Sequence, residues 1–497
     1  MHVNKLLGRA AQNWPDRLMV ICGEDEITYS DLYRRSNIFA KTLQQKGVQQ
    51  GDHVLIFYEN SIEFYIAYFA VWHAGGIVTP LNVFLHENEL RQIIVEAEPK
   101  VLIISPTLSQ KIAAIPENEL PITISHIDLS QDISSKDSLI IPPEVDEDET
   151  VALLYTSGTT GFPKGVMLSS KNIMTNAIQS VSALEVGTNE RVFCPLPLFH
   201  SLPQNVCVWS VLVAGATAII VPKIDRRSLL RGIEHKPTII IAVPAVYGLF
   251  CMLKTIKFGA VKYFVAGGDA LSDKIRSFFA MIYGRKIANG YGLTETSPFI
   301  AVDFDDYTQP TNTIGHPIHG IRYEIRDTQG KSLPHGSIGI LWVAGDNVMK
   351  GYYKASEATA AILHNGWLNT GDLAYLTPEG KVVLAGRERD LISNKGLKIY
   401  PQEIENILLS HPAVLQAGVI GVAQEKDEEV PIAYVATKDA EDRHDELIEK
   451  LRIICQRNLA AYKVPRQFYV LKELAVTTTG KVDKKVLRQI YEDQFKD

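Results

Sequence analysis

The sequence has few of the features that mark membrane-spanning, secreted or disordered chains. Its most apolar stretch, residues 206–221, is interrupted by Ser210, Gly215 and Thr217 and is too short to cross a bilayer. The first eighteen residues contain no continuous apolar run of signal-peptide length. Long charge runs and low-complexity tracts are also missing, and disordered chains are rich in both. These absences predict a folded cytoplasmic protein, with peripheral contact to a membrane left open.

Cysteine and basic charge are scarce as well. The five cysteines form no close pair and no cluster with zinc-ligand spacing. They are Cys22, Cys194, Cys207, Cys251 and Cys455. Scattered cysteines in a long chain indicate a reducing compartment. The formal net charge of −7 disfavours a nucleic-acid binder, which usually needs a basic surface to meet phosphates.

What the chain does contain is a regular alternation of short apolar runs and helix-period stretches. With 497 residues it is too long for one compact core, so we expect two or three domains. Residues 87–97 are one helix-period stretch between apolar runs. The apolar runs that read as buried strands are residues 53–58, 101–105, 217–222, 238–244 and 262–266. This alternation predicts an α/β fold with layered, mostly parallel sheets.

The pattern of expected strands and helices changes twice towards the C-terminus. From about residue 320 the pattern is β-rich with Gly and Pro turns, which predicts a small β-subdomain. A new βα pattern begins after Gly-Arg-Glu-Arg-Asp-Leu at residues 386–391, and about a hundred residues remain. We therefore predict a large N-terminal domain, residues 1–389. A small α+β C-terminal domain, residues 390–497, follows it.

The strongest chemical signal is a loop rich in Gly, Ser and Thr at residues 155–165, which reads YTSGTTGFPKG. Glycines let backbone N–H groups approach an anion, while the hydroxyls and Lys164 add donors and positive charge. A polyphosphate tail needs these groups. The loop is not a Walker A loop, because no G-x-x-x-x-G-K-[ST] can be read in it. A flexible surface turn is the less specific alternative.

This loop resembles the phosphate-binding signature of the acyl-adenylate-forming superfamily, which includes acyl-CoA synthetases, aryl-CoA ligases, firefly luciferases and adenylation domains of peptide synthetases. Four further stretches match in order and spacing, so the resemblance covers nearly the whole chain. They are PLPLFHS (195–201), YGLTET (291–296), WLNTGDLAY (367–375) with GRERDLISNKGLKIYPQEIE (386–405), and TTTGK (477–481). The resemblance implies an ATP- and Mg²⁺-dependent acid–thiol ligase that forms an acyl-adenylate, releases pyrophosphate and passes the acyl group to coenzyme A.

Residue chemistry and the resemblance together predict a metal and phosphate site. Glu295 is a hard oxygen ligand suited to Mg²⁺, and the resemblance adds Thr156 as a second ligand. It also places Thr294 against the α-phosphate. Further phosphate contacts are expected from the loop residues Ser157, Gly158, Thr159, Thr160, Gly161 and Lys164.

The nucleoside is expected to lie against other matched positions. Asp372 stands in a Thr-Gly-Asp turn, where a carboxylate can accept hydrogen bonds from both ribose hydroxyls. The resemblance places Arg387 on the same side of the ribose and Tyr291 against the adenine. The remaining predicted nucleotide contacts are Gly268, Asp269, Asn289, Gly290 and Gly292.

The resemblance implies that Lys481 is the catalytic lysine of the adenylation step. A cation there offsets the repulsion between the attacking carboxylate and the anionic ATP. His200 is expected beside the acyl carboxylate and completes the predicted catalytic set with Glu295 and Lys481. A histidine buried in the core is the alternative for His200.

In the family the small domain is mobile and rotates between the two half-reactions. The hinge residue matches Asp390, and hinge residues absorb backbone rotation without touching substrate. One orientation delivers Lys481. The other delivers residues 393–399, with Gly396 flanking the pantetheine tunnel and Lys395 near the CoA phosphates.

The identity of the acid follows from the residues expected around it. The predicted acyl pocket consists of His200, Val243, Tyr247, Gly267, Gly268 and Gly290. These residues are mostly apolar or small, as an alkyl or aryl group requires. Residues 201–209 contain no Asp or Glu to pair with a substrate amine, which disfavours an amino acid. A fatty acid of medium or long chain is favoured, and an aromatic acid is next.

Four alternatives have different weights. An adenylating enzyme that uses acyl-carrier protein, or that stops at the adenylate, stays open. A luciferase-like reaction would need a dedicated luciferin pocket. An inert nucleotide-binding regulator would have no need of Lys481. Hydride transfer is excluded because no G-x-G-x-x-G follows a strand. A homodimer stays open.

Overall fold

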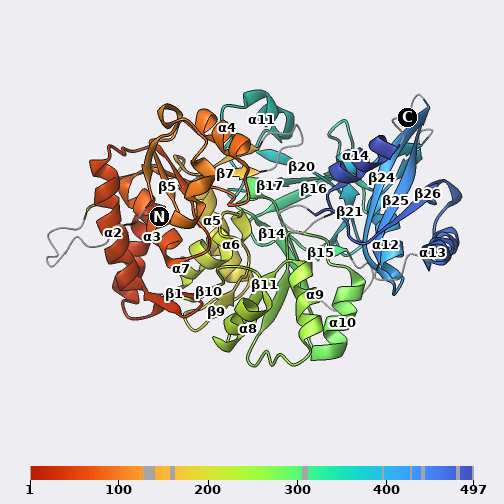
Figure 1. The fold of residues 1–497 in the computed structure, drawn as a ribbon, viewed down its shortest axis with the longest axis horizontal. Helices are drawn as coiled ribbons and strands as arrows, with labels where there is room; N and C mark the ends of the chain where they lie inside the picture. Colours follow the sequence, from red (N-terminus) through yellow and green to blue (C-terminus); the bar gives the residue numbers. More distant parts are fainter. Residues whose placement is uncertain are drawn as a thin grey trace.

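The architecture comes from a computed structural model that describes most of the chain. It covers residues 2–125, 127, 140–156, 163–304, 312–394, 397–425, 428–437, 443–476 and 482–494. Its strands form four sheets. Figure 1 shows a larger body built from the red-to-green part of the chain and a smaller body, in blue, built from the C-terminal elements. The predicted α/β fold class is confirmed.

The first sheet has seven strands in the spatial order β18-β8-β7-β4-β3-β5-β6. The strands are β3 (His53–Phe57), β4 (Ile77–Pro80), β5 (Val101–Ile104), β6 (Ile122–Ile124), β7 (Thr150–Thr156), β8 (Lys164–Ser169) and β18 (Gly351–Tyr352). Its centre is parallel, while β7, β8 and β18 pair in antiparallel fashion. The antiparallel hairpin of β7 and β8 flanks the predicted phosphate loop, because β7 ends at Thr156 and β8 begins at Lys164.

The second sheet has eight strands in the order β14-β13-β12-β11-β9-β10-β1-β2. They are β1 (Leu18–Cys22), β2 (Asp25–Thr28), β9 (Arg191–Phe193), β10 (Thr217–Ile220), β11 (Ile239–Ala242), β12 (Tyr263–Ala266), β13 (Ala288–Gly292) and β14 (Phe299–Asp303). The six inner strands are parallel, and the two edge strands are antiparallel. The apolar strands β10 and β11 are buried from end to end, as expected for strands covered on both faces.

Helix α3 (Ile62–Ala74) lies between these two sheets and contacts strands of both. Every one of its residues except Glu63 is buried, and a helix that is apolar on all sides is stable only in such a setting. The Ser61 side chain caps its first turn by accepting a hydrogen bond from the Phe64 N–H, and Gly75 ends it with a left-handed conformation. One continuous core therefore joins both sheets.

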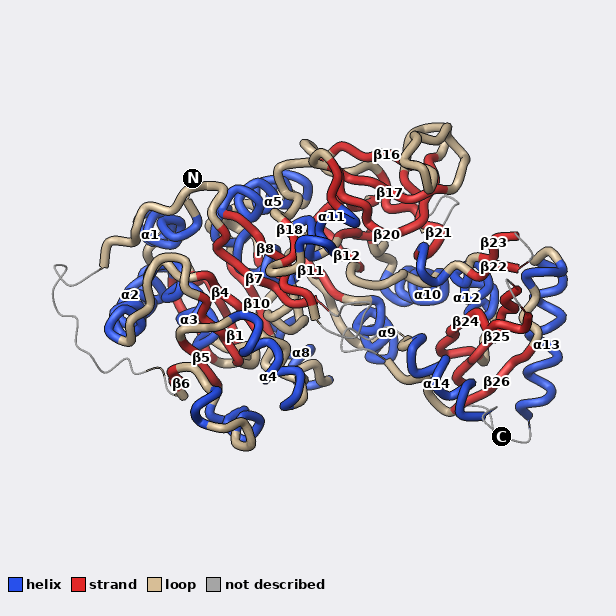
Figure 2. Tube along the Cα trace, turned by 90° about the horizontal axis from the view of Figure 1, so that it is seen from above, coloured by secondary structure: helices blue, strands red, loops and turns tan. Residues whose placement is uncertain are grey.

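Further helices pack around the two sheets (Figure 2). They are α1 (Val3–Asn13), α2 (Tyr29–Gln45), α4 (Glu87–Ala97), α5 (Ser170–Ala183), α6 (Ser201–Gln204), α7 (Ser210–Ala214), α8 (Arg226–Glu234), α9 (Pro244–Leu253), α10 (Asp273–Tyr283) and α11 (Ser356–Ile362). Within the described part of the chain, no helix has the length and apolar character that a membrane span requires.

The predicted β-subdomain is a six-stranded antiparallel sheet. Its strands are β15 (Thr313–Gly315), β16 (Arg322–Arg326), β17 (Gly339–Ala344), β19 (Leu363–His364), β20 (Trp367–Leu376) and β21 (Val382–Arg387). The hairpin of β20 and β21 places Asp372 directly opposite Arg387. Two residues predicted to serve the ribose are thus neighbours through strand register.

The C-terminal elements form a separate sheet with its own cores. The elements are β22 (Ile392–Asn394), β23 (Leu397–Ile399), α12 (Pro401–Ser410), β24 (Val414–Glu425), β25 (Glu428–Thr437), α13 (His444–Asn458), β26 (Gln467–Leu471) and α14 (Lys484–Gln494). No strand of this sheet pairs with the larger body among the described residues. This separation supports the proposed boundary between residues 389 and 390.

Candidate active site

The candidate site lies at the carboxyl ends of the parallel strands β11, β12 and β13. Val243 follows β11, Gly267 and Gly268 follow β12, and Gly290 lies in β13. Ligands of open α/β sheets bind beyond this edge, because the strand-to-helix connections leave a crevice there. Residues predicted from separate motifs thus come together at one edge of the second sheet.

Asp372 lies at the centre of a buried polar cluster on the nucleotide side. The Tyr291 hydroxyl donates to Asp372 Oδ2 at 2.6 Å, and Arg387 Nε lies 3.2 Å from Asp372 Oδ1. The charge of Asp372 raises the pKa of Arg387. Burial, and then the Asp372 charge, raises the pKa of Tyr291 well above its usual value. The cluster therefore holds the Asp372 carboxylate in a fixed orientation, and the remaining lone pairs of its oxygens can accept further hydrogen bonds.

Glu295 is held by a tyrosine that the sequence analysis did not identify. The Tyr352 hydroxyl donates to Glu295 Oε1 at 2.8 Å, and Lys164 Nζ lies 5.1 Å from the centre of the Tyr352 ring. Burial, and then the charge of Glu295, raises the pKa of Tyr352. Tyr352 reaches this position because β18 pairs with β8, the strand that Lys164 begins. No sequence pattern signals such a long-range strand pairing.

The oxygen ligands that Glu295 and Thr156 offer suit Mg²⁺ better than a metal held by protein ligands alone. In the part of the chain that the structure describes, no three His, Cys, Asp or Glu side chains gather to hold a metal. Glu295 offers a carboxylate and Thr156 a hydroxyl, which also donates to the Lys164 carbonyl oxygen at 3.5 Å. Mg²⁺ is usually bound by one or two carboxylates together with substrate phosphates and water.

Beside the polar cluster lies a cavity of about 330 Å³. Its described lining includes the predicted residues His200, Val243, Gly267, Gly268 and Gly290. No Asp, Glu, Lys or Arg is found among the described residues of that lining. Leu, Ile, Val, Pro and Phe make up most of the wall, which suits an apolar group.

Tyr247 does not line this cavity, so its predicted place in the acyl pocket is wrong. Tyr247 belongs to α9, and its side chain is fully buried in the second apolar core. Its hydroxyl donates to the carbonyl oxygens of Ile240 and Val265 at 3.0 and 2.9 Å. Ala245, Val246 and Leu249 of the same helix line the cavity instead. The helix turns Tyr247 towards the sheet, and a motif read without helix phase does not reveal this.

His200 lies at the polar end of the cavity, and burial lowers its pKa to about 4. Its Nε2 atom is buried and has no hydrogen-bond partner among the described residues. The Phe199 ring lies beside it in a tilted arrangement, with ring centres 4.2 Å apart. A neutral imidazole with one unpaired ring nitrogen, facing an apolar cavity, can hydrogen-bond a substrate group without adding charge.

The other predicted residues have local partners or fall outside the described residues. Thr294 Oγ1 lies 3.0 Å from Ser201 Oγ, and the Asn289 side chain donates to the Thr313 carbonyl oxygen at 2.9 Å. Asp269 Oδ1 accepts from the Ala270 N–H at 2.8 Å, and Gly292 ends β13. Eight predicted residues lie outside the described part of the chain: Ser157, Gly158, Thr159, Thr160, Gly161, Lys395, Gly396 and Lys481.

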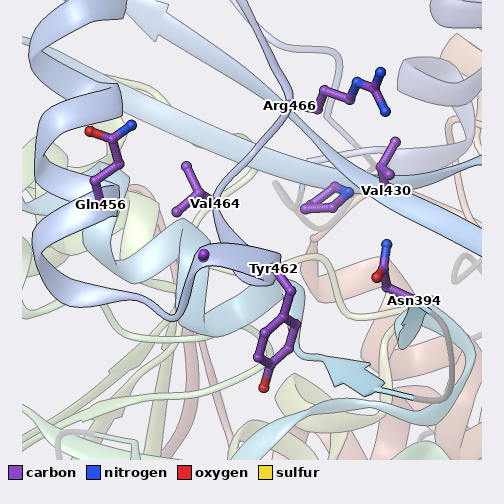
Figure 3. Close-up of a pocket in the computed structure, with 8 residues that line it drawn as sticks. Asn394, Val430, Gln456, Tyr462, Val464 and Arg466 are labelled. Atoms are coloured by element: carbon purple, nitrogen blue, oxygen red, sulfur yellow. The ribbon is translucent and has the colours of Figure 1, made fainter.

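A second hollow of about 380 Å³ lies in the C-terminal domain (Figure 3). Its lining contains Asn394, Tyr462 and Arg466, and the Tyr462 side chain is 37% exposed. Asn394 immediately precedes the predicted CoA residues Lys395 and Gly396. An exposed aromatic ring and a guanidinium in one hollow are suited to a nucleotide-like group.

Comparison with known proteins agrees with this geometry. A family profile described as "AMP-binding enzyme" matches residues 7–353, and the profile of its C-terminal domain matches residues 403–481. The long-chain-fatty-acid–CoA ligase of Bacillus subtilis is 31% identical over 97% of this chain and 93% of its own length. The feruloyl-CoA synthase of Amycolatopsis sp. is 30% identical over 97% of both chains. ATP-bound MatB from Rhodopseudomonas palustris superposes with a TM-score of 0.88 at 28% identity, over the full length of both chains.

The fold, the cluster around Asp372 and the apolar cavity define the class as an acid–thiol ligase. The chain belongs to the AMP-binding enzyme family, whose two profiles together match most of its length.

Proposed function

We propose that this protein is an AMP-forming acyl-CoA ligase for an apolar carboxylic acid, with a medium- or long-chain fatty acid favoured. The observation that supports the acid is the cavity beside His200, whose described lining contains no charged side chain. A second carboxylate or an amine on the substrate would lose its hydration there without gaining a partner.

The nucleotide side of the site accounts for activation of the acid. The phosphates of ATP lie along the loop of residues 156–164, with Lys164 and Thr294 as donors, and Asp372 and Arg387 hold the ribose. Bound Mg²⁺, held by Glu295 and Thr156, neutralises phosphate charge. An oxygen of the acid attacks the α-phosphorus, a P–O bond forms, and pyrophosphate leaves. Positioning and neutralisation of charge supply most of the acceleration.

His200 has a binding role in this proposal. Because burial keeps its imidazole neutral at pH 7, the ring can donate one N–H to the substrate carboxylate without forming an ion pair. Lys481 supplies the cation that bridges the carboxylate and the α-phosphate.

The second half-reaction transfers the acyl group to the CoA thiol. The sulfur attacks the carbonyl carbon of the acyl-adenylate, a C–S bond forms, and AMP leaves with the electrons of the C–O bond. The hollow around Tyr462 and Arg466 supports CoA as the acceptor, because these side chains suit an adenine ring and a phosphate. We propose Asp390 as the hinge between the two half-reactions.

An aromatic acid is the second candidate. The cavity wall includes Tyr291 and Phe299 as well as His200, so a flat ring would find aromatic neighbours. The name of one relative, feruloyl-CoA synthase, also favours an aromatic acid.

Pyrophosphate release with Mg²⁺-ATP, across straight-chain, branched and aromatic acids with and without CoA, tests the proposal. We expect release that depends on an apolar acid and accelerates with CoA, and Lys481→Ala should abolish it. A dicarboxylic acid serves as the control for apolar selectivity. Release that CoA does not accelerate would favour a carrier protein or an adenylate-only enzyme, and preference for the dicarboxylic acid would refute the apolar assignment.

A further inference from the structure

The acyl cavity reaches the molecular surface at the end away from the nucleotide. Ile224 and Leu249 line the cavity, yet their side chains are 43% and 37% exposed. A residue that faces both a cavity and solvent marks an opening. The opening lies between the β10–α8 connection, which contains Ile224, and helix α9, which contains Leu249. Figure 1 shows α8 and α9 at the lower edge of the larger body.

The apolar surface continues beyond this opening along α9. Ala245, Leu249 and Met252 have helical spacing of four and three residues, so they share one face of α9. Met252 is 65% exposed. The opposite face, with Tyr247 and Phe250, packs into the core. One face of α9 therefore forms an apolar path from the cavity to solvent.

Positive charge is concentrated in the segment that contains the opening, although the whole chain is acidic. Two of its cations, Lys223 and Arg231, pair with Asp225 and Glu24. Residues 223–257 contain seven Lys and Arg against two Asp and Glu, a net charge of +5 in a chain of −7. Arg226 and Arg227 lie in the first turn of α8, after Ile224 and the N-cap residue Asp225, and are exposed. Lys254 follows Met252 and is also exposed. None of these three cations has an ion-pair partner among the residues that the structure describes.

We propose that this face is a docking surface for an anionic lipid bilayer, through which the acid enters the cavity. We call it the lipid-docking face and define it by Ile224, Leu249, Met252, Arg226, Arg227 and Lys254. Exposed apolar side chains next to unpaired cations match a bilayer surface, where acyl chains lie behind negatively charged headgroups. The inference rests on the proposed function, because an opening into an apolar cavity is useful to a substrate that partitions into lipid.

Co-sedimentation with vesicles tests the docking step without any activity. Two vesicle types serve as probes, phosphatidylcholine alone and equal parts of phosphatidylcholine and phosphatidylglycerol. We expect the protein to bind the anionic vesicles preferentially, and high salt should weaken the binding. Arg226→Gln with Arg227→Gln should weaken it roughly five-fold for each charge removed, and Met252→Asn should weaken it as well. The matched control is Lys46→Gln with Lys100→Gln, two exposed lysines on α2 and before β5.

Turnover links docking to substrate entry. With a water-soluble short apolar acid, pyrophosphate release should be equal in all these variants, since none of the changed residues lines the cavity. With a long-chain acid supplied in anionic vesicles, release should fall in the Arg226/Arg227 and Met252 variants only.

Several outcomes would overturn the inference. These are no binding of the unmodified protein to anionic vesicles, equal loss in the control pair, or self-association that Met252→Asn abolishes without any vesicle binding. The last outcome would identify a second copy of the chain as the occupant. Vesicle binding with no pyrophosphate release from any acid would instead refute the proposed function and leave the docking surface in place.

Discussion

The Tyr291 hydroxyl donates a 2.6 Å hydrogen bond to Asp372, a residue 81 positions further along the chain. Tyr291 lies in β13 of the mostly parallel sheet, and Asp372 lies in β20 of the antiparallel subdomain. The bond thus joins two sheets at the nucleotide side of the site. Besides its expected contact with adenine, Tyr291 therefore orients the carboxylate of Asp372, the residue that we propose binds the ribose.

Tyr291→Phe should raise the KM for ATP about ten-fold while kcat changes less. Hydrogen bonds to charged groups contribute roughly 1.5–3 kcal/mol, and about 1.4 kcal/mol corresponds to a factor of ten. The phenyl ring keeps the contact with adenine, so the loss reports on Asp372 alone. Steady-state kinetics with varied ATP measure it. Tyr375→Phe, on the same strand as Asp372, is the control, and an equal effect there would contradict the assignment.

Tyr352→Phe should raise the Mg²⁺ concentration needed for half-maximal activity by about ten-fold. Groups that orient a metal ligand typically affect metal affinity by roughly 10- to 100-fold, and Tyr352 holds Glu295 at 2.8 Å. Activity at saturating Mg²⁺ should recover most of its original level. Titration of Mg²⁺ at fixed ATP measures the shift, with Tyr353→Phe as the neighbouring control. An unchanged Mg²⁺ requirement would remove Glu295 from the metal site.

His200 should make the folded protein sensitive to acid. Its pKa is lowered to about 4 in the folded state, whereas an unfolded histidine titrates near 6.5. Between these values the unfolded chain binds more protons, so stability falls as the pH drops from about 6.5 to 4. The full effect is about 3 kcal/mol, from roughly 1.4 kcal/mol for each unit of pKa.

Denaturant unfolding across that pH range can detect this contribution. His200→Phe should show a shallower loss of stability with acid than the unmodified protein, because the titrating group is gone. His319→Phe, at an exposed position, should retain the original slope. If the His200 and His319 variants lose stability in parallel with the unmodified protein, the buried imidazole is not responsible.

Substitution of Asp390 should show whether the small domain rotates about this residue. Its carboxylate lies 3.8 Å from Lys484 Nζ and 4.0 Å from an Arg488 guanidinium nitrogen, both on α14. Asp390→Pro fixes φ at that position and should block one half-reaction more than the other. Asp390→Asn, which loses only the ion pairs, should affect both half-reactions mildly and equally. Separate assays of adenylate formation and of thioester formation from supplied acyl-adenylate measure this. Survival of both half-reactions in the Pro variant would contradict the hinge.

A domain-spanning contact adds a reason to expect more than one orientation. Lys274 Nζ of α10 donates to the backbone carbonyl oxygens of Pro412 and Val414 at 3.0 and 2.8 Å, and burial lowers its pKa. The two bodies have separate main cores, and Leu391 and Tyr400 of the smaller body also pack against a small apolar cluster of Ile340, Trp342 and Leu373. Such small contacts can break and re-form at little cost, in contrast to a large shared apolar core.

The sequence by itself determined the α/β class, the two-part organisation and the family, because apolar periodicity and short motifs are local properties of the chain. It also placed Glu295, Asp372 and Arg387 in polar turns and strands. Only the tertiary structure decided that Tyr352 holds Glu295, that Tyr247 faces the core and that the exposed Ile224 and Leu249 line the apolar cavity. Each of these depends on strand pairing or helix phase between distant segments, and the free energy of those contacts comes from burial that no local pattern records.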